Sequence, residues 1–95
     1  KNKVYIGFVS KVYKKVGAID VKLESGEIKL GDTILIIGDK SGVHEHKVDS
    51  MQTDPGVDVK SAKKGKVVGI LVKSLAQKIR PNDKVFILES LINTK

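Results

Sequence analysis

Cysteine is absent from the 95 residues of this chain. The sequence therefore excludes disulfide scaffolds, thiolate zinc sites and cysteine nucleophiles. Long apolar runs are missing as well, because runs such as Ile34–Ile37 stop after four residues, whereas a membrane-spanning helix needs about 20. No N-terminal stretch has the charged start and apolar core of a signal peptide. We therefore expect a cytoplasmic protein without a membrane segment.

Motifs of nucleotide binding and of hydrolytic nucleophiles are also missing. No stretch follows the Gly-x-x-x-x-Gly-Lys-Ser/Thr pattern of a phosphate-binding loop, and Gly38–Gly42 is so short that it indicates a hairpin loop. No Gly-x-Ser-x-Gly motif occurs. Asp54 and Asp58 flank Pro55-Gly56, which indicates a loop rather than an acid and base pair. We therefore expect no nucleotide, no other cofactor and no enzymatic activity of the chain alone.

The length of the chain fits one small domain. A hydrophobic fraction of 40% and a charged fraction of 31% are typical of a folded globular domain, so we expect a single domain over residues 1–95. The chain begins with Lys1 rather than Met. We therefore also expect either a processed N-terminus or one domain of a longer protein.

Positive charge is in excess. The chain has 18 Lys and Arg against 11 Asp and Glu, which gives a net charge of +7, and the isoelectric point is about 9.7. Arg80 is the only arginine. Lysine is a flexible point charge, whereas the planar arginine fork suits specific phosphate and base contacts. The charge therefore favours general attraction to polyanions over a specific nucleic-acid code, with a well-solvated lysine surface as an equal alternative.

Short apolar and β-branched runs between turns predict an all-β fold. The predicted strands are Val4–Val12, Ala18–Glu24, Asp32–Gly38, Val43–Gln52, Val67–Lys73 and Lys84–Leu88. Thr53–Lys66 is predicted to be a polar connection, and Ser74–Ile79 to hold one short helical turn. Strands of this length and spacing predict a small closed six-stranded antiparallel β-barrel.

The inward faces of the strands differ in clarity. In Ala18–Glu24, apolar and polar residues alternate, so that one face is expected to be buried. In the first run Val4 and Ile6 have one parity and Val9 the other, which leaves the inward face ambiguous. In Val43–Gln52 the odd spacing of the apolar residues predicts a bulge.

Two segments share one pattern of residues. Lys29–Ile34 and Arg80–Val85 each have a basic residue, a turn pair, Asp, a polar residue and a β-branched strand start. Gly31 and Asn82 occupy matching positions, and both residue types tolerate positive φ. Ala62–Val67 is a looser third copy. We interpret these segments as tight turns that lead into strands, rather than as ligand sites.

His44 and His46 are the only histidines. At positions i and i+2 of a strand they are expected to face the same side, where two metal ligands can converge. A third ligand would have to come from another part of the chain. An exposed polar strand face is therefore the default interpretation, and a metal site the minor alternative.

Lysines gather in two predicted turns. Lys11, Lys14 and Lys15 lie at the end of the first strand and in the turn after it, and Lys63, Lys64 and Lys66 lie in the turn before the fifth strand. Tyr13 beside Lys14 can stack a base while lysine meets phosphate, but packing over the end of the barrel is its favoured role. Together with Arg80 and Tyr13, the six lysines are our candidate RNA-binding residues.

Five segments follow one another along the chain in a recognisable order. They are Gly7–Val9 with Lys15–Ile19, Gly26–Asp32, Val48–Gln52, Ala62–Ile70 and Ile79–Val85. This order resembles the second domain of translation GTPases, which is the β-barrel of elongation factor Tu and of bacterial initiation factor two. The resemblance covers about residues 4–88 and leaves 89–95 as a C-terminal tail.

The resemblance implies a site and a function. Gln52 stands where the elongation factors have a glutamate near the terminal adenosine of tRNA, and Ile28 matches an apolar residue beside the same pocket. The sequence is most similar to small stand-alone elongation factor-like barrels without a GTPase domain. The resemblance therefore implies a non-enzymatic module that binds tRNA or the ribosome through its lysine-rich surface.

A related barrel closes some collagenase-like peptidases as a C-terminal appendage, where the resemblance implies contacts with substrate or RNA. This implies the alternative function, a protein-interaction domain or an appended domain of a larger enzyme. The run Ile34–Ile37, which is apolar on both faces, agrees with docking on a neighbouring domain.

Overall fold

The computed structural model describes residues 2–54 and 56–89, which form ten strands and one short 3₁₀ helix. In chain order these elements are β1 (Asn2–Tyr13), β2 (Ala18–Leu23), β3 (Glu27–Lys29), β4 (Thr33–Gly38), β5 (Gly42–Lys47), β6 (Met51–Thr53), β7 (Val57–Asp58), β8 (Ser61–Lys63), β9 (Val67–Leu71), η1 (Lys73–Gln77) and β10 (Lys84–Glu89). In the part of the chain that the structure describes, no helix is long and apolar enough to cross a membrane.

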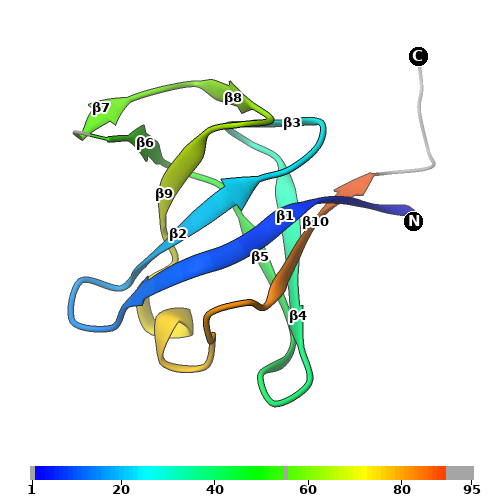
Figure 1. Cartoon of the computed structure of the whole chain (residues 1–95). Coiled ribbons are helices and arrows are strands. Elements are labelled where there is room, and N and C mark those ends of the chain that lie inside the picture. The colour runs from blue at the N-terminus through cyan, green and yellow to red at the C-terminus, as the bar shows by residue number, and fades with distance from the viewer. Residues whose placement is uncertain (1, 55, 90–95) are drawn as a thin grey trace.

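Eight of the strands form one antiparallel sheet, in the order β5-β4-β10-β1-β2-β9-β6-β7. The remaining two, β3 and β8, pair with each other. The large sheet is curled, so that β1, β2 and β9 lie in front of β4 and β5 (Figure 1). The β1–β2 turn, η1 and the β4–β5 hairpin lie at one end of the molecule, and β3, β6, β7 and β8 lie at the other.

The antiparallel all-β fold is confirmed, but the closed six-stranded barrel is not. Among the described residues the hydrogen-bonded sheet has two ends, at β5 and β7. The predicted polar connection Thr53–Lys66 contains strands of two or three residues, which are too short for an alternating pattern to show. The predicted strand Val43–Gln52 is interrupted, because the backbone of Val48 bonds to Gly31 and Asp32 instead of continuing the pairing with β4.

The long strand β1 pairs with β10 along its first half and with β2 along its second half. Its register shifts between Tyr5 and Gly7 and again between Val9 and Lys11. These irregularities turn both Ile6 and Val9 toward the core, although their spacing is not that of a regular strand. The irregular spacing of apolar residues in Val4–Val12 is therefore explained by the two register shifts of β1.

The core is made of aliphatic side chains supplied by both halves of the curled sheet. The largest completely buried side chains include Ile6, Ile19, Leu23, Ile34, Met51, Ile70 and Ile79. Ala18–Leu23 buries its alternate residues as its pattern predicts. The aromatic pair Tyr5 and Phe86 packs edge to face outside this core, with ring centroids 5.7 Å apart. Burial of aliphatic surface is therefore the main stabilising contribution.

Two turns confirm the repeated sequence pattern. The backbone N–H of Lys29 donates to Asp32 Oδ2 at 2.8 Å, and that of Arg80 donates to Asp83 Oδ2 at 2.9 Å. In both turns the Asp N–H donates back to the carbonyl of the basic residue, at 3.0 and 3.2 Å. The third residue of each turn, Gly31 or Asn82, has positive φ. The looser copy at Lys63–Lys66 has the same backbone bond and a positive φ at Gly65.

The helical segment η1 (Lys73–Gln77) lies within the predicted segment Ser74–Ile79, apart from its first residue. It begins against the β1–β2 turn, where the N–H groups of Val72 and Lys73 both donate to the Gly17 carbonyl at 2.8 Å. Gln77 Nε2 donates to the Lys14 carbonyl at 3.0 Å. The helix and this turn therefore form one rigid unit.

Candidate functional site

A row of mostly polar residues crosses the outer face of the sheet. Lys11 of β1 is paired with Asp20 of β2, Asp20 with Gly69 of β9, Gly69 with Gln52 of β6, and Gln52 with Asp58 of β7. Gln52 Nε2 donates to Asp58 Oδ1 at 3.0 Å. The pairing of five strands thus aligns residues that lie far apart in the sequence.

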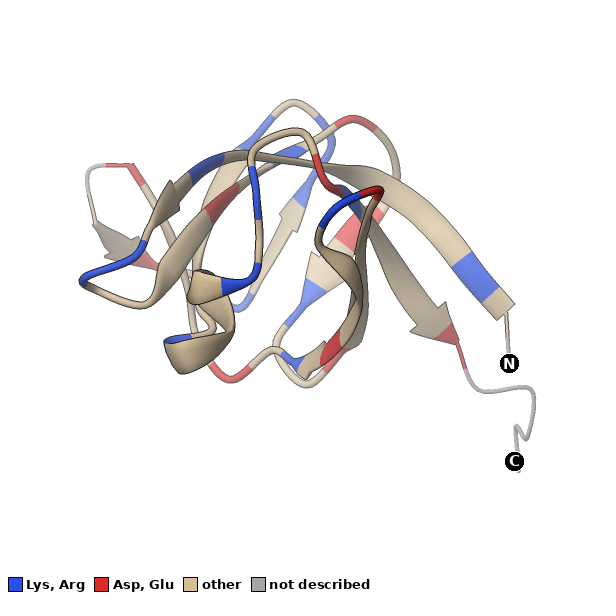
Figure 2. Ribbon diagram, turned by 90° about the horizontal axis from the view of Figure 1, so that it is seen from below, with Lys and Arg blue, Asp and Glu red and all other residues tan. Residues whose placement is uncertain are grey.

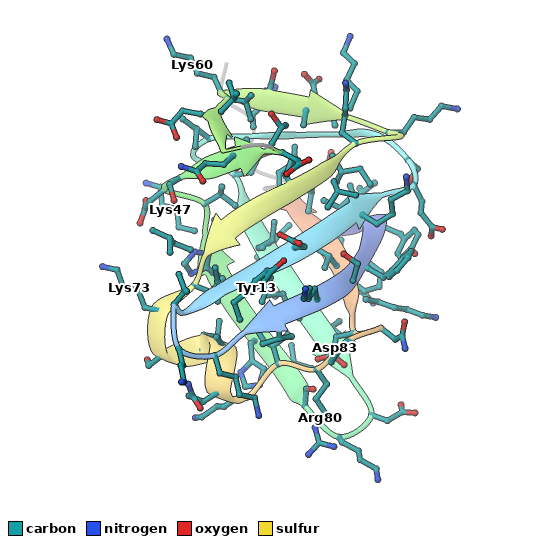
Figure 3. All side chains as sticks on the ribbon, turned by 60° about the vertical axis from the view of Figure 1, so that its left-hand side comes forward. Tyr13, Lys47, Lys60, Lys73, Arg80 and Asp83 are labelled. Atoms are coloured by element: carbon teal, nitrogen blue, oxygen red, sulfur yellow. The ribbon has the colours of Figure 1, made fainter. Side chains whose placement is uncertain are left out.

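Tyr13 stands at one end of this row, where it is half-buried (Figure 3). Its hydroxyl donates to Asp20 Oδ2 at 2.9 Å, and Lys11 Nζ lies 5.1 Å from its ring centroid. The hydrogen bond to Asp20 is the largest cause of a raised Tyr13 pKa, followed by burial and by the charges of Asp20 and Asp54. Ring and hydroxyl are both in use within the domain, which supports a packing role for Tyr13 rather than base stacking.

Shallow hollows lie on both sides of Gly69. They have volumes of about 190 and 370 Å³ and share Tyr13, Asp20, Gln52 and Gly69 as lining residues. Because glycine has no side chain, the floor between them is backbone. The carboxylates of the walls are those of Asp20 and Asp54, and Asp20 accepts a hydrogen bond from Tyr13. This arrangement can accept hydrogen bonds from a ligand, but it does not present a nucleophile with its base.

The two residues of the implied adenosine pocket do not share a surface. Ile28 on β3 is completely buried in the core. Gln52 on β6 is exposed on the outer face and holds Asp58. A ligand that touched Gln52 would not reach Ile28 without opening the core.

The two predicted lysine clusters lie at opposite ends of β2. Lys14 and Lys15 are exposed in the turn beside Ala18, the first residue of β2. Lys63, Lys64 and Lys66 are exposed around the turn whose backbone bonds to Leu23, the last residue of β2. A six-residue strand separates the clusters by roughly 16 Å. They therefore do not form one continuous patch.

The histidines face the same side of β5, as predicted. Their cross-strand partners on β4 are the buried residues Ile36 and Ile34, so this is the inner side of the sheet. His44 Nε2 lies 2.6 Å from the Ser41 carbonyl, and His46 Nε2 is buried without a hydrogen-bond partner. Within residues 2–54 and 56–89, His, Asp and Glu form no group of three or more that could hold a metal ion. The metal alternative therefore has no support from the described structure.

Sequence reasoning missed a larger grouping of positive charge, which we name the basic end. It comprises the exposed residues Lys14, Lys15, Lys40, Lys73, Lys78, Arg80 and Lys84. They belong to the β1–β2 turn, the β4–β5 hairpin, η1 and the segment from Lys78 to the first residue of β10, which come together at one end of the molecule (Figure 2). Arg80 lies at this end and Lys60 at the opposite one (Figure 3).

Carboxylates are scarce at the basic end. On the same elements Asp39 is exposed, whereas Asp83 is 7% exposed and turned toward Gly38. Glu24, Glu27, Asp32, Asp49, Asp54 and Asp58 belong to the turns and short strands of the opposite end. There they accompany Lys29, Lys60, Lys63, Lys64 and Lys66, so that charges of both signs are mixed. Only the folded chain separates the charges in this way.

Comparison with known proteins identifies peptidases as relatives. The chain is 42% identical over 90 residues to an uncharacterized protease of Methanocaldococcus jannaschii, and 35% identical over 86 residues to a collagenase of Porphyromonas gingivalis. These alignments cover 95% and 90% of the chain. The chain spans only about a fifth of the curated relatives it matches, namely 21% and 20% of their lengths. No family model matches the sequence.

Two solved structures share this fold. The fold matches the crystal structure of the C-terminal domain of a Geobacillus thermoleovorans protein described as a U32 peptidase, with a TM-score of 0.80 and 15% sequence identity. The match covers 90% of this chain and 93% of that domain. A selenomethionine variant of the same domain matches with a TM-score of 0.76, at 16% identity over 85% of this chain.

These relatives overturn the inferred kinship with translation factors. The expected RNA-binding module of translation, acting on tRNA or the ribosome, is wrong, because the sequence matches fall on a protease and a collagenase. The five segments that resembled the elongation-factor barrel consist largely of turns and strand starts. Such segments indicate a type of β-fold, and proteins with unrelated functions can share one fold.

Proposed function

We propose that this chain is the C-terminal domain of a peptidase of the U32 and collagenase type, and that it is an accessory domain without a catalytic centre. One observation carries this proposal: the chain aligns over 95% of its length with a protease of which it spans 21%. The fold match to a domain crystallised as the C-terminal part of such a protein supports it.

The use of the carboxylates supports an accessory role. Asp32 and Asp83 hold the backbones of their turns, Asp20 and Glu24 accept hydrogen bonds from Tyr13 and Tyr5, and Asp58 accepts one from Gln52. Carboxylates engaged in this way hold turns and side chains of the domain in place, which agrees with a structural role. Catalysis is therefore assigned to the remainder of the parent chain, which is also the partner we propose for this domain.

The size of the native gene product tests the proposal. An antibody raised against the 95-residue chain should detect a protein about five times as long, as the 21% share predicts. Mass spectrometry of the captured band should return peptides from this chain together with peptides from an N-terminal remainder. A native product of about 10.3 kDa would contradict the proposal. The cytoplasmic location stays a prediction, which fractionation with the same antibody tests.

A peptidase assay tests the division of labour. The parent chain is expected to cleave gelatin, whereas the isolated 95-residue chain should release no fragments at equal molar concentration. Cleavage by the isolated chain would show a catalytic centre within it. The parent chain without this domain is the matched control, since it should keep its reactive groups and lose only what the accessory domain adds.

A further inference from the structure

The basic end has a charge distribution that the proposed function does not use. Seven exposed cations there oppose one exposed carboxylate, that of Asp39. Surface charges of one sign raise the local concentration of oppositely charged ligands and accelerate their association. The excess of positive charge is therefore expected to attract anionic groups to the basic end.

Hydrogen bonds hold the turns and the helix that carry these cations in place. Gln77 joins η1 to the β1–β2 turn, and the Gly17 carbonyl receives the start of the helix. Arg80 donates its backbone N–H to Asp83, whose carboxylate occupies the space beside Gly38 of the β4–β5 hairpin. A hollow between the hairpin and the loop into β10 is lined by Lys40, Arg80 and Lys84, among others. The cations therefore form a defined surface and not a flexible tail.

The chemistry of this surface favours acidic polypeptide as its ligand. Tyr5, Phe8 and Phe86 lie within β1 and β10, away from the turns of the basic end. Tyr13 ends β1 beside the β1–β2 turn, but its ring lies against Lys11 and its hydroxyl donates to Asp20. Among the described residues, the basic end therefore offers no free Tyr or Phe ring on which bases can stack. Lysine ammonium groups pair with single carboxylates without needing a planar partner. The exposed apolar residues Val16 and Val43 stand on separate elements, whereas a permanent interface has an apolar centre.

We propose that the basic end is a docking surface for acidic stretches of polypeptide substrates, which it captures weakly and reversibly. That the acidic polypeptide is a substrate rests on the proposed function. The binding itself rests only on the arrangement of the cations. Attraction between exposed charges is screened by salt, so binding weakens as ionic strength rises.

Fluorescence anisotropy with a labelled oligoglutamate peptide tests the proposal on the 95-residue chain. Two variants with the same change in net charge are compared: Lys73→Glu plus Lys78→Glu at the basic end, and Lys63→Glu plus Lys64→Glu at the opposite end. We expect the first to weaken binding about tenfold and the second at most about twofold, because only the first alters the docking surface. Equal losses in both variants would reduce the effect to net charge and overturn the proposal.

Two further measurements complete the test. Lys15→Glu plus Lys40→Glu alters the same surface on two other elements, so it replaces the helix variant if that variant fails to melt cooperatively, and it should weaken binding to a similar extent. A single-stranded RNA with the same number of charges is the competing ligand. If RNA binds more tightly than oligoglutamate and loses affinity in the same variants, the proposal fails.

The source of the acidic polypeptide is tested in the parent enzyme. Lys73→Glu plus Lys78→Glu should raise KM for a glutamate-rich peptide substrate, leave kcat unchanged and leave KM for a neutral peptide unchanged. An unchanged KM for the acidic peptide would show that substrate is not the ligand. Because the anisotropy measurement needs no peptidase, it decides the docking surface even if the parent chain proves to have another activity.

Discussion

At the scale of single residues, Gly7 shows how closely two strands of this sheet approach. A Cβ atom at this position would lie 1.9 Å from the carbonyl oxygen of Lys22, a distance that no side chain tolerates. This oxygen belongs to the backbone of the neighbouring strand, which cannot move aside as the tip of a side chain can. Glycine is therefore required here by space.

We expect Gly7→Ala to lower the free energy of unfolding by at least about 2 kcal/mol, because β1 and β2 must separate to admit the methyl group. Gly69→Ala is the matched control, since the nearest atom to its added Cβ is Asp20 Oδ1 at 3.4 Å. The control should change stability by less than about 1 kcal/mol. Urea denaturation of both variants measures the difference, and equal effects would show that the contact at Gly7 relaxes.

Tyr13 gives a prediction about pH. Its pKa is raised above the ordinary value of 10.0, chiefly by its hydrogen bond to Asp20. A group whose pKa is higher in the folded state contributes stability that is complete below the unfolded pKa and is lost as pH rises through the folded pKa. We therefore expect the folded state to lose this contribution above about pH 10 and not at neutral pH.

Spectrophotometric titration of the Tyr5→Phe variant observes Tyr13 alone, because the chain has only two tyrosines. Its midpoint should lie above 10.0 and fall toward that value when Asp20→Asn is added. A midpoint that does not respond to Asp20→Asn would exclude the hydrogen bond as the cause. Tyr5 itself has a raised pKa, mainly through its hydrogen bond to Glu24, so it must be removed for the comparison.

At the scale of elements, the repeated turns carry most of what could be predicted from the sequence. The pattern of basic residue, turn pair and Asp occurs at Lys29 and at Arg80, and both copies fold into the same hydrogen-bonded turn. Such turns are local, since their bonds join residues three apart, so their residue types are sufficient to identify them.

The two turns differ in burial, which gives a matched pair of substitutions. Asp83 is 7% exposed, whereas Asp32 is half-buried. Asp83→Ala leaves the Arg80 N–H without its partner in a part-buried setting and should cost about 1–3 kcal/mol of unfolding free energy. Asp32→Ala should cost about 1 kcal/mol or less, because water can reach the freed N–H of Lys29. Thermal and urea unfolding measure both, and a larger loss for Asp32→Ala would reverse the assignment.

The short strands could not be predicted. β3, β6, β7 and β8 have two or three residues each, and their pairing depends on contacts with distant segments. β3 pairs with β8, which lies more than thirty residues further along the chain, and nothing within Glu27–Lys29 indicates this partner. The β6 and β7 end of the sheet is made of these short strands, so the course of the sheet at that end could not be predicted, and the closed barrel is not confirmed.

At the scale of the whole molecule, the distribution of charge is the feature that sequence could not reveal. The two halves of the chain have nearly equal net charge, yet folding gathers cations from four separate segments at the basic end. The sequence predicts two lysine clusters as candidate RNA-binding residues, and β2 separates them in the fold. The separation of the turns along the sequence does not indicate which of them meet at the same end of the folded molecule.

Crowded cations repel one another in the folded state, and added salt screens this repulsion. We therefore expect the melting temperature of the chain to rise by a few degrees between low and physiological concentrations of sodium chloride. The rise should be smaller in Lys73→Glu plus Lys78→Glu, which relieves the repulsion, than in Lys63→Glu plus Lys64→Glu. An equal rise in the two variants would show that the basic end is not where repulsion is concentrated.

The position of β10 in the sheet has a consequence for the order of folding. The last strand of the described chain lies between β1, the first strand, and β4. Until β10 has been synthesised, β1 and β4 have no hydrogen-bonded connection, and the large sheet is divided into two separate groups of strands. Closing β1 on β10 spans almost the whole domain, and such long-range pairing is slow. During synthesis this domain must therefore wait for its own last strand before its core can form.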